Sequence, residues 1–293
     1  MKVAVLGATG FVGSALLPAL ASRHDVVGVS RRPQPEQPGG IRWTTADVLR
    51  AEDVRRALDG VEVAYYLVHS LGSRDFEERD TRAAENVARE AERAGVRRLV
   101  YLGGLGDDSS DLSSHLRSRR ETGLSLASGA VPVTTLRAAI VVGRGSAAFE
   151  TVVALVKRLP VMLCPRWVST PTQPIALDDV VHYLSEAADH AGLEGGTFDV
   201  GGPEVLTYRD MIERIGVLLR RRPRILEVPV LTPRLSSYWL HLVTPVGAAV
   251  ARPLIDGLRN ETVVRETRIR SLIPRELTPF DVAARSALAE IAE

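Results

Sequence analysis

Three glycines near the start of the chain have the spacing of a phosphate-binding turn. The stretch "VLGATGFVGS", residues 5–14, contains Gly7, Gly10 and Gly13 in a Gly-x-x-Gly-x-x-Gly pattern. A short apolar, β-branched stretch precedes them, and apolar residues at helical spacing follow. A turn without side chains lets the N–H groups of a helix N-terminus hold an anion. We therefore expect Gly7 to make the turn, Gly10 to admit a pyrophosphate, and Gly13 to let helix and strand pack closely.

The glycine triplet also has a simpler interpretation, a glycine-rich turn that binds no ligand. Its spacing differs from the Gly-x-Gly-x-x-Gly of most dehydrogenases. The strand before it and the helix after it nevertheless favour cofactor binding.

The elements around this turn alternate between strands and helices, which is typical of a parallel sheet covered on both faces. The clearest helix is expected over 76–94, with an apolar stripe and Gly95 as its C-cap. This order predicts an α/β fold, a Rossmann-type doubly wound parallel sheet. The expected strands are 2–6, 25–29, 41–44, 61–67, 97–102 and 131–136.

The alternation ends near residue 137, and the rest of the chain is expected to form a smaller substrate lobe. We assign 1–143 to a dinucleotide-binding domain and 144–293 to a lobe interleaved with its sheet. Prolines cluster at 158–174, which predicts a shaped loop on a pocket wall. A strand and turn are expected over 197–202, followed by a helix capped by Thr207.

Composition narrows the function classes. The chain has 293 residues and a formal net charge of +1, which gives no electrostatic case for nucleic-acid binding. The single Cys164 suits a reducing compartment, and the start of the chain reads directly into a strand without a signal peptide. No run of about 18 apolar residues appears, so no membrane span is expected. The histidines show no metal-ligand spacing, and no metal is expected. These features predict a cytoplasmic protein.

Several further sequence motifs follow one another along nearly the whole chain. They are "GATGFVG" (7–13), "ADV" (46–48), "YYLVHSL" (65–71), "VYLGGL" (100–105), "LRAAIVVG" (136–143), "QPIALDDVVHYL" (173–184) and "TFDVGGPEVLTYRDM" (197–211). With these motifs the chain resembles the atypical and extended short-chain dehydrogenase/reductase superfamily, in its NmrA-like branch of NAD(P)H-binding proteins.

The resemblance implies a set of cofactor-binding residues. A basic residue after the second strand meets the 2′-phosphate in NADP-using relatives, whereas NAD enzymes carry a carboxylate there. The sequence has "VSRRP" at this place, which favours NADP(H) over NAD(H), although both arginines can also be solvated turn charges. The implied cofactor-binding residues are Gly7, Thr9, Gly10, Phe11, Gly13, Arg31, Arg32, Asp47, Val48, His69 and Ser70.

The chain departs from the family at the catalytic pair. Family reductases use Tyr-x-x-x-Lys on one helix, and His115 and Arg119 stand at these places. A histidine can carry a proton, whereas an arginine can bind ribose hydroxyls but is a poor proton relay. In one interpretation His115 is a catalytic acid. In the other, the helix that carries His115 has lost the catalytic Tyr–Lys pair, and Arg119 is kept for cofactor binding or for a surface ion pair. Gly103 and Gly104 replace the Ser or Thr that many relatives carry after the preceding strand.

Two classes of function therefore remain open. The first is NADPH-dependent reduction of a hydrophobic carbonyl or quinone-like substrate. The second is a non-catalytic dinucleotide-binding sensor or accessory subunit with a protein partner, of the NmrA or respiratory complex I type. A nucleotide-sugar epimerase or dehydratase is more distant, because it depends most on the missing tyrosine. A homodimer is possible for either class.

Two further regions complete the predictions. The aromatic, apolar stretch at 235–246 is expected to be a core helix closing the substrate lobe, or else a surface for a membrane or partner. The substrate pocket is expected to include Gly103, Gly104, Met162, Trp167 and Gln173 beside His69, Ser70, His115 and Arg119.

Overall fold

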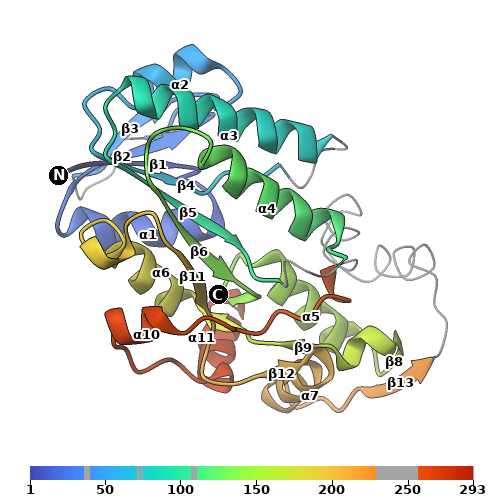
Figure 1. Cartoon of the computed structure of the whole chain (residues 1–293). Helices are drawn as coiled ribbons and strands as arrows, with labels where there is room; N and C mark the ends of the chain where they lie inside the picture. The colour runs from blue at the N-terminus through green and yellow to red at the C-terminus, as the bar shows by residue number, and fades with distance from the viewer. Residues whose placement is uncertain (36–39, 71–72, 74, 107–110, 229–256, 293) are drawn as a thin grey trace.

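A seven-stranded parallel sheet forms the centre of the protein (Figure 1). The computed structural model describes residues 1–35, 40–70, 73, 75–106, 111–228 and 257–292. The strand order is β11-β6-β5-β4-β1-β2-β3, so the chain starts in the middle and winds outward in both directions. The strands are β1 (Lys2–Leu6), β2 (Asp25–Ser30), β3 (Arg42–Thr45), β4 (Val63–Tyr66), β5 (Arg98–Gly104), β6 (Val133–Ala138) and β11 (Thr197–Val200). The predicted fold class is confirmed.

Strand β1 lies between β2 and β4, with Val3 opposite Val26 on one side and Val63 on the other. Apolar β-branched residues dominate these strands because both faces of a parallel sheet are covered. The carboxyl ends of the strands therefore meet at one edge, where the turns after β1, β2, β4 and β5 come together.

Helices α2 (Ala51–Ala57), α3 (Phe76–Arg93) and α4 (Ser114–Leu126) cover one face of the sheet. Helix α3 buries Ala84, Val87 and Ala91 along one stripe, as its periodicity predicts. It ends at Arg93, and Gly95 follows with φ +71°, the left-handed conformation expected of a C-cap glycine.

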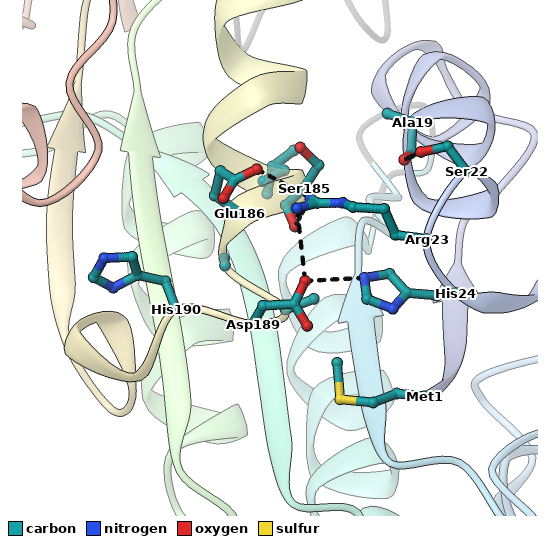
Figure 2. A network of polar contacts seen from close by, with 12 residues as sticks. Met1, Ala19, Ser22, Arg23, His24, Ser185, Glu186, Asp189 and His190 are labelled. Atoms are coloured by element: carbon teal, nitrogen blue, oxygen red, sulfur yellow. Dashed lines mark hydrogen bonds and ion pairs between the residues drawn. The ribbon is translucent and has the colours of Figure 1, made fainter.

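Helices α1 (Phe11–Ala21), α6 (Leu177–Glu186) and α10 (Arg268–Leu272) lie on the other face. Two polar contacts fasten α6 to this face. Buried Tyr65 on β4 donates its hydroxyl to the carbonyl of Leu184 at 2.8 Å. Arg23 and His24, just after α1, point toward Asp189 (Figure 2), with nitrogen–oxygen distances of 3.7 and 3.2 Å. These contacts lie at the opposite end of α1 from the glycine turn and hold the fold together.

A second core lies beside the sheet and belongs to the later part of the chain. This core is built from α5 (Ala147–Arg158), β8 (Val161–Pro165), η1 (Arg166–Ser169), α7 (Tyr208–Leu218), β13 (Arg224–Val228) and α11 (Phe280–Ala292). Helix α7 begins with a capping box in which the hydroxyl of Thr207 accepts from the N–H of Asp210 at 3.1 Å, as the sequence predicts for its cap.

Among the described helices, none is long and apolar enough to cross a membrane.

Residues after 143 contribute to both bodies, because β11 extends the main sheet beside β6 and α6 packs on α1. The proline-rich stretch 158–174 is not a plain loop, contrary to expectation. It holds strand β8, which pairs in parallel with the distant β13. Local sequence could not reveal this pairing, because Pro160 and Pro165 stand at its ends and its partner lies 63 residues further on (Val161 pairs with Arg224). The stretch 235–246 lies outside the described residues.

Candidate functional site

The glycine turn has the backbone geometry that a bound phosphate requires. Gly7 has φ +88°, and the N–H of Gly10 donates to its carbonyl at 2.9 Å. A Cβ on Gly13 would lie 3.0 Å from the Cα of Ala8 and inside the van der Waals envelope of the Gly7 carbonyl. Glycine at these positions is thus required by backbone conformation at the first and by close packing at the third.

Gly10 has a different role, because its φ of −77° suits any residue. It is the N-cap of α1 and has no side chain to satisfy the first N–H groups of that helix. The helix N-terminus therefore presents unpaired donors and the positive end of its dipole where an anion can approach.

A first cavity of about 420 Å³ opens in front of this turn, and we call it the turn cavity. It brings together most of the predicted cofactor-binding residues from the ends of β1, β2, β3 and β4. Its polar lining consists of Thr9, Ser30, Arg31, Asp47, His69, Ser70, Ser73 and Arg79, with Gly7, Gly10 and Val48 among the other wall residues.

Three predicted cofactor residues lie elsewhere. Phe11 and Gly13 line the second cavity described below. Arg32 is exposed and does not line the turn cavity, although Arg31 does. The carbonyl of Arg32 accepts a hydrogen bond from the hydroxyl of Ser30, a contact within the turn after β2.

Asp47 and Val48 are held in place by local hydrogen bonds. The carboxylate of Asp47 accepts from the N–H of Leu49 at 3.0 Å, and the carbonyl of Val48 accepts from Asn86 at 3.1 Å. The two residues thereby form a rigid wall of the turn cavity, which suits the flat face of an adenine.

Arg79 is a site residue that the sequence reasoning missed. It lies in the first turns of α3 and lines the turn cavity, and its buried Nε has no hydrogen-bond partner in the described part of the structure. A buried guanidinium nitrogen without a partner is costly unless a ligand completes it. Its sequence signal is weak, because it stands among charged neighbours that read as an exposed helix face.

The second cavity, about 400 Å³, adjoins the first and shares Gly10, Leu67 and His69 with it. We call it the apolar cavity, because aliphatic and aromatic side chains make up most of its wall. The predicted Gly103, Gly104, His115 and Arg119 line it as well. The apolar side chains in its wall include Phe11, Leu102, Leu105, Leu116, Ile140, Val141, Tyr208 and Leu258.

His69 stands at the boundary of the two cavities and is held by a buried carboxylate. Its Nδ1 lies 2.7 Å from Oδ2 of Asp80, and the other oxygen of Asp80 accepts from the N–H of Ser70 at 2.9 Å. Burial lowers the pKa of His69, and the hydrogen bond to Asp80 opposes this. Asp80 was also missed, although a charged residue on the buried stripe of α3, in register with Ala84 and Val87, was a readable signal.

His115 and Arg119 both reach the cavity, but they differ in what holds them. Burial lowers the pKa of His115 to about 3, and His69 and Arg119 add to the shift, so its imidazole is neutral at pH 7. Arg119 donates to the carbonyl of Leu102, and its guanidinium lies 5.2 Å from the ring of Tyr101. Arg119 is therefore fastened to β5.

The glycines of β5 make room for helix α4. A Cβ on Gly104 would meet Leu116 at 3.0 Å and Arg119 at 3.6 Å, and one on Gly103 would meet Tyr101 at 3.2 Å. Gly103 and Gly104 stand where many relatives carry a Ser or Thr. Without a side chain at Gly104, the helix that carries His115 packs closely against the strand.

Three predicted pocket residues line neither of these cavities. Met162 is buried in the second core, where β8 packs against α7. Trp167 packs edge-on against Tyr208 at 6.3 Å between ring centroids. Gln173 is buried, and its side chain donates to the carbonyl of Gly202 and accepts from the N–H of Val264. Met162 lies in the strand that pairs with β13, Trp167 packs against the second core while partly buried, and Gln173 joins distant loops.

Comparison with known proteins agrees with this geometry. The family model described as NAD(P)H-binding matches residues 7–128, which include the glycine turn, His69, Asp80 and His115. Residues 7–128 are therefore similar to the NAD(P)H-binding domains that this family model describes. This match agrees with the expected resemblance to NAD(P)H-binding proteins, and the likeness to solved structures shows the Rossmann-like fold.

Two curated relatives cover most of the chain. One is an NADH dehydrogenase [ubiquinone] 1 alpha subcomplex subunit 9, mitochondrial, of Arabidopsis thaliana, 23% identical over 95% of this chain and 75% of its own. Another is a (4-alkanoyl-5-oxo-2,5-dihydrofuran-3-yl)methyl phosphate reductase of Streptomyces griseus, 29% identical over 78% of this chain and 77% of its own.

A solved structure extends the likeness to the whole fold of this chain. An NADPH-dependent quinone oxidoreductase of Escherichia coli, in complex with NADPH, superposes with a TM-score of 0.79. The match covers 99% of this chain and 100% of that one at 20% identity.

Proposed function

We propose that this protein uses NADPH to reduce an apolar carbonyl or quinone-like compound. The observation that carries the proposal is the junction of the two cavities at Gly10 and His69. A dinucleotide held by the glycine turn has its adenosine half in the turn cavity, and its other half reaches the apolar cavity. That cavity leaves space for an apolar acceptor beside the nicotinamide.

The preference for NADPH is supported by Arg31. Its guanidinium lines the turn cavity at the end of β2, where an NAD enzyme carries a carboxylate for the ribose hydroxyls. A guanidinium fork matches a phosphate in geometry and charge. The quinone oxidoreductase of similar fold is NADPH-dependent by its description, which agrees with this assignment.

The residues divide the work by position. Gly10 and the N-terminus of α1 hold the pyrophosphate, Arg31 the 2′-phosphate, and Ser70 the ribose nearest the nicotinamide. When bound, the cofactor supplies a hydride. The apolar wall excludes water and places the acceptor, which accounts for much of what a hydride transfer needs from its protein.

A second candidate, a dinucleotide-binding accessory subunit, is favoured by the relative from Arabidopsis and by the absent Tyr-x-x-x-Lys pair. In this case the protein binds the dinucleotide without turnover, and its partner is a protein. A cytoplasmic location and a homodimer stay predictions for both candidates.

The test is a calorimetric titration with NADPH, NADP, NADH and NAD, followed by NADPH oxidation assays with menadione, benzoquinones and apolar enones. Arg31→Ala should weaken NADP(H) binding about 10- to 100-fold and leave NAD(H) binding nearly unchanged, since a charge-assisted phosphate contact contributes about 1.5–3 kcal/mol. Arg32→Ala is the matched control, because it removes the same charge outside the cavity and should change neither.

Three outcomes would count against the proposal. Equal binding of NADH and NADPH would remove the assigned preference. Binding without oxidation by any acceptor would favour the accessory-subunit alternative. Binding of no dinucleotide would overturn both functions.

A further inference from the structure

The site contains a buried carboxylate, that of Asp80, which has no role in the proposed function as stated above. Asp80 is 1% exposed, and both of its oxygens are engaged, one by His69 and one by the N–H of Ser70. Within the described residues, His69 is the only ion-pair partner that the structure gives it. A buried carboxylate is costly without a positive charge beside it, so Asp80 favours a protonated His69.

The hydrogen bond to Asp80 also sets the tautomer of His69. A carboxylate accepts only, so Nδ1 of His69 must carry its proton toward Asp80. Nε2 is then the nitrogen that gains and loses the exchangeable proton. It is buried and has no hydrogen-bond partner among the described residues.

A second histidine lies directly beside the first. The ring centroids of His69 and His115 are 5.2 Å apart with the planes tilted by 43°. Nδ1 of His115 is likewise buried without a partner among the described residues, whereas the residue itself is partly exposed and lines the apolar cavity. Two adjacent imidazoles thus each bury one unpartnered nitrogen, and these two nitrogens are close but not hydrogen-bonded to each other in this structure. The outer imidazole, that of His115, borders the space for a substrate.

We propose that Asp80, His69 and His115 form a proton relay that ends at the oxygen of a substrate in the apolar cavity. The proposal rests on the proposed function. It makes His115 the catalytic residue and Asp80 a positioning residue that acts through His69.

The step balances for a carbonyl acceptor. The carbonyl carbon gains the hydride that NADPH supplies, and its oxygen takes the proton on Nε2 of His115. A rotation of the two rings, whose centroids lie 5.2 Å apart, brings Nδ1 of His115 to Nε2 of His69 and lets it take the proton there. His69 then becomes neutral and keeps its Nδ1 proton, which stays hydrogen-bonded to Asp80. The products are an alcohol and NADP⁺. Water then returns one proton to Nε2 of His115, which lines the cavity, and Nδ1 of His115 passes its proton back to Nε2 of His69.

The proton transfer requires both histidines, because His69 holds the extra proton and His115 lines the substrate cavity. His115 alone holds no extra proton near neutral pH, since burial, His69 and Arg119 all disfavour its charged form. His69 has Asp80 to stabilise the charge, against burial and against Arg119 on α4. Phe76 on α3 presents an apolar ring to the other side of His69 at 6.4 Å.

The experiment compares wild type, Asp80→Asn, His69→Gln and His115→Ala by the pH profile of kcat for NADPH oxidation. Wild-type kcat should fall as pH rises through the pKa of His69. Asp80→Asn should move this inflection to lower pH and lower kcat at pH 7 by about 10- to 100-fold, the scale of general acid catalysis, with KM for NADPH nearly unchanged. Imidazole should restore part of the activity of His115→Ala.

Glu77→Gln is the matched control, since it neutralises another carboxylate on α3, whose ion-pair partner is Arg117 at 3.4 Å and not a histidine. It should leave rate and profile unchanged. Histidine NMR titrations supply a readout that needs no turnover: Asp80→Asn should lower the pKa of His69, and His69→Gln should shift the ring signals of His115.

The outcomes separate the two proposals. A wild type that binds NADPH but reduces no acceptor would overturn the proposed function. Turnover that survives in His115→Ala, or a pH profile that Asp80→Asn leaves in place, would overturn the relay alone. An unchanged His69 titration in Asp80→Asn would overturn it independently of any assay.

Discussion

The first and third members of the glycine turn have different physical tasks from the second, and substitution by alanine should separate them. In Gly13→Ala the new methyl collides with the backbone, since its Cβ would lie 3.0 Å from the Cα of Ala8 and 3.1 Å from the carbonyl carbon of Gly7. Both neighbours are main-chain atoms of the turn, so α1 itself must move away from β1.

The cost can be worked from this geometry. Overpacking a close-packed site costs about 1–3 kcal/mol, and replacing a helical glycine by alanine returns up to about 1 kcal/mol. The contact with the Gly7 carbonyl oxygen, closer than the other two, places this site in the upper part of that range, about 2–3 kcal/mol. A return of about 1 kcal/mol then leaves a net loss of unfolding free energy of about 1–2 kcal/mol. For a domain of this size that corresponds to a Tm about 2–8 °C lower. Ser14→Ala, an exposed change on the same helix, should leave Tm unchanged.

Gly10→Ala should show the opposite pattern. The nearest atom to its Cβ is the Gly7 carbonyl oxygen at 3.2 Å, and its φ of −77° accepts alanine, so the apo protein should lose less than about 1 kcal/mol. The methyl group, however, borders both cavities and blocks the approach of a pyrophosphate to the helix N-terminus. Binding of NADPH should weaken about 10- to 100-fold.

Scanning calorimetry of the apo proteins and titration calorimetry with NADPH measure the two effects separately. The reasoning is refuted if Gly13→Ala melts with the wild type, or if Gly10→Ala binds NADPH as tightly as the wild type does. Loss of stability in both variants would show that the turn has a single structural role.

Two further predictions concern charged residues. Arg79→Gln should weaken the binding of NADPH and NADH alike, by about 10-fold in calorimetry, because the buried Nε of Arg79 has no protein partner among the described residues and is left for the ligand. Unchanged affinity for both dinucleotides would exclude Arg79 from the site. Glu204→Gln should lower stability by about 1 kcal/mol at pH 7, because Glu204 accepts from Arg214 at 2.6 Å and from the N–H of Phe280 at 2.9 Å. Burial would raise the pKa of Glu204, but these partners lower it on balance, so the stabilisation is complete above about pH 4.5 and is lost as pH falls through the lowered pKa. In urea titrations of both proteins, the difference in unfolding free energy should therefore be larger at pH 7 than at pH 3.

The alternation of strands and helices was readable because it depends on local periodicity. The helix expected over 76–94 is found at Phe76–Arg93, and Gly95 has the left-handed conformation of its cap. Backbone sterics and short-range hydrogen bonds decide these features within a few residues. The glycine turn is readable for the same reason, since its conformation and its closest contacts lie mostly within one strand and one helix.

Residues far apart in the sequence were beyond such reasoning. Met162 was expected in the pocket, but the pairing of β8 with β13 turns it into the second core. Of the two arginines after β2, only Arg31 lines the turn cavity, and the spacing of the residues did not distinguish them.

The sequence by itself determined that a dinucleotide-binding turn opens a parallel sheet and that His115 stands where a catalytic tyrosine is absent. Only the tertiary structure decided which groups surround that histidine. Asp80 and His69 come from a helix and a strand end 11 positions apart, and α4 delivers His115 to them across the edge of the sheet. Their proximity follows from the packing of α3 and α4 on one face, a long-range arrangement that no local spacing encodes.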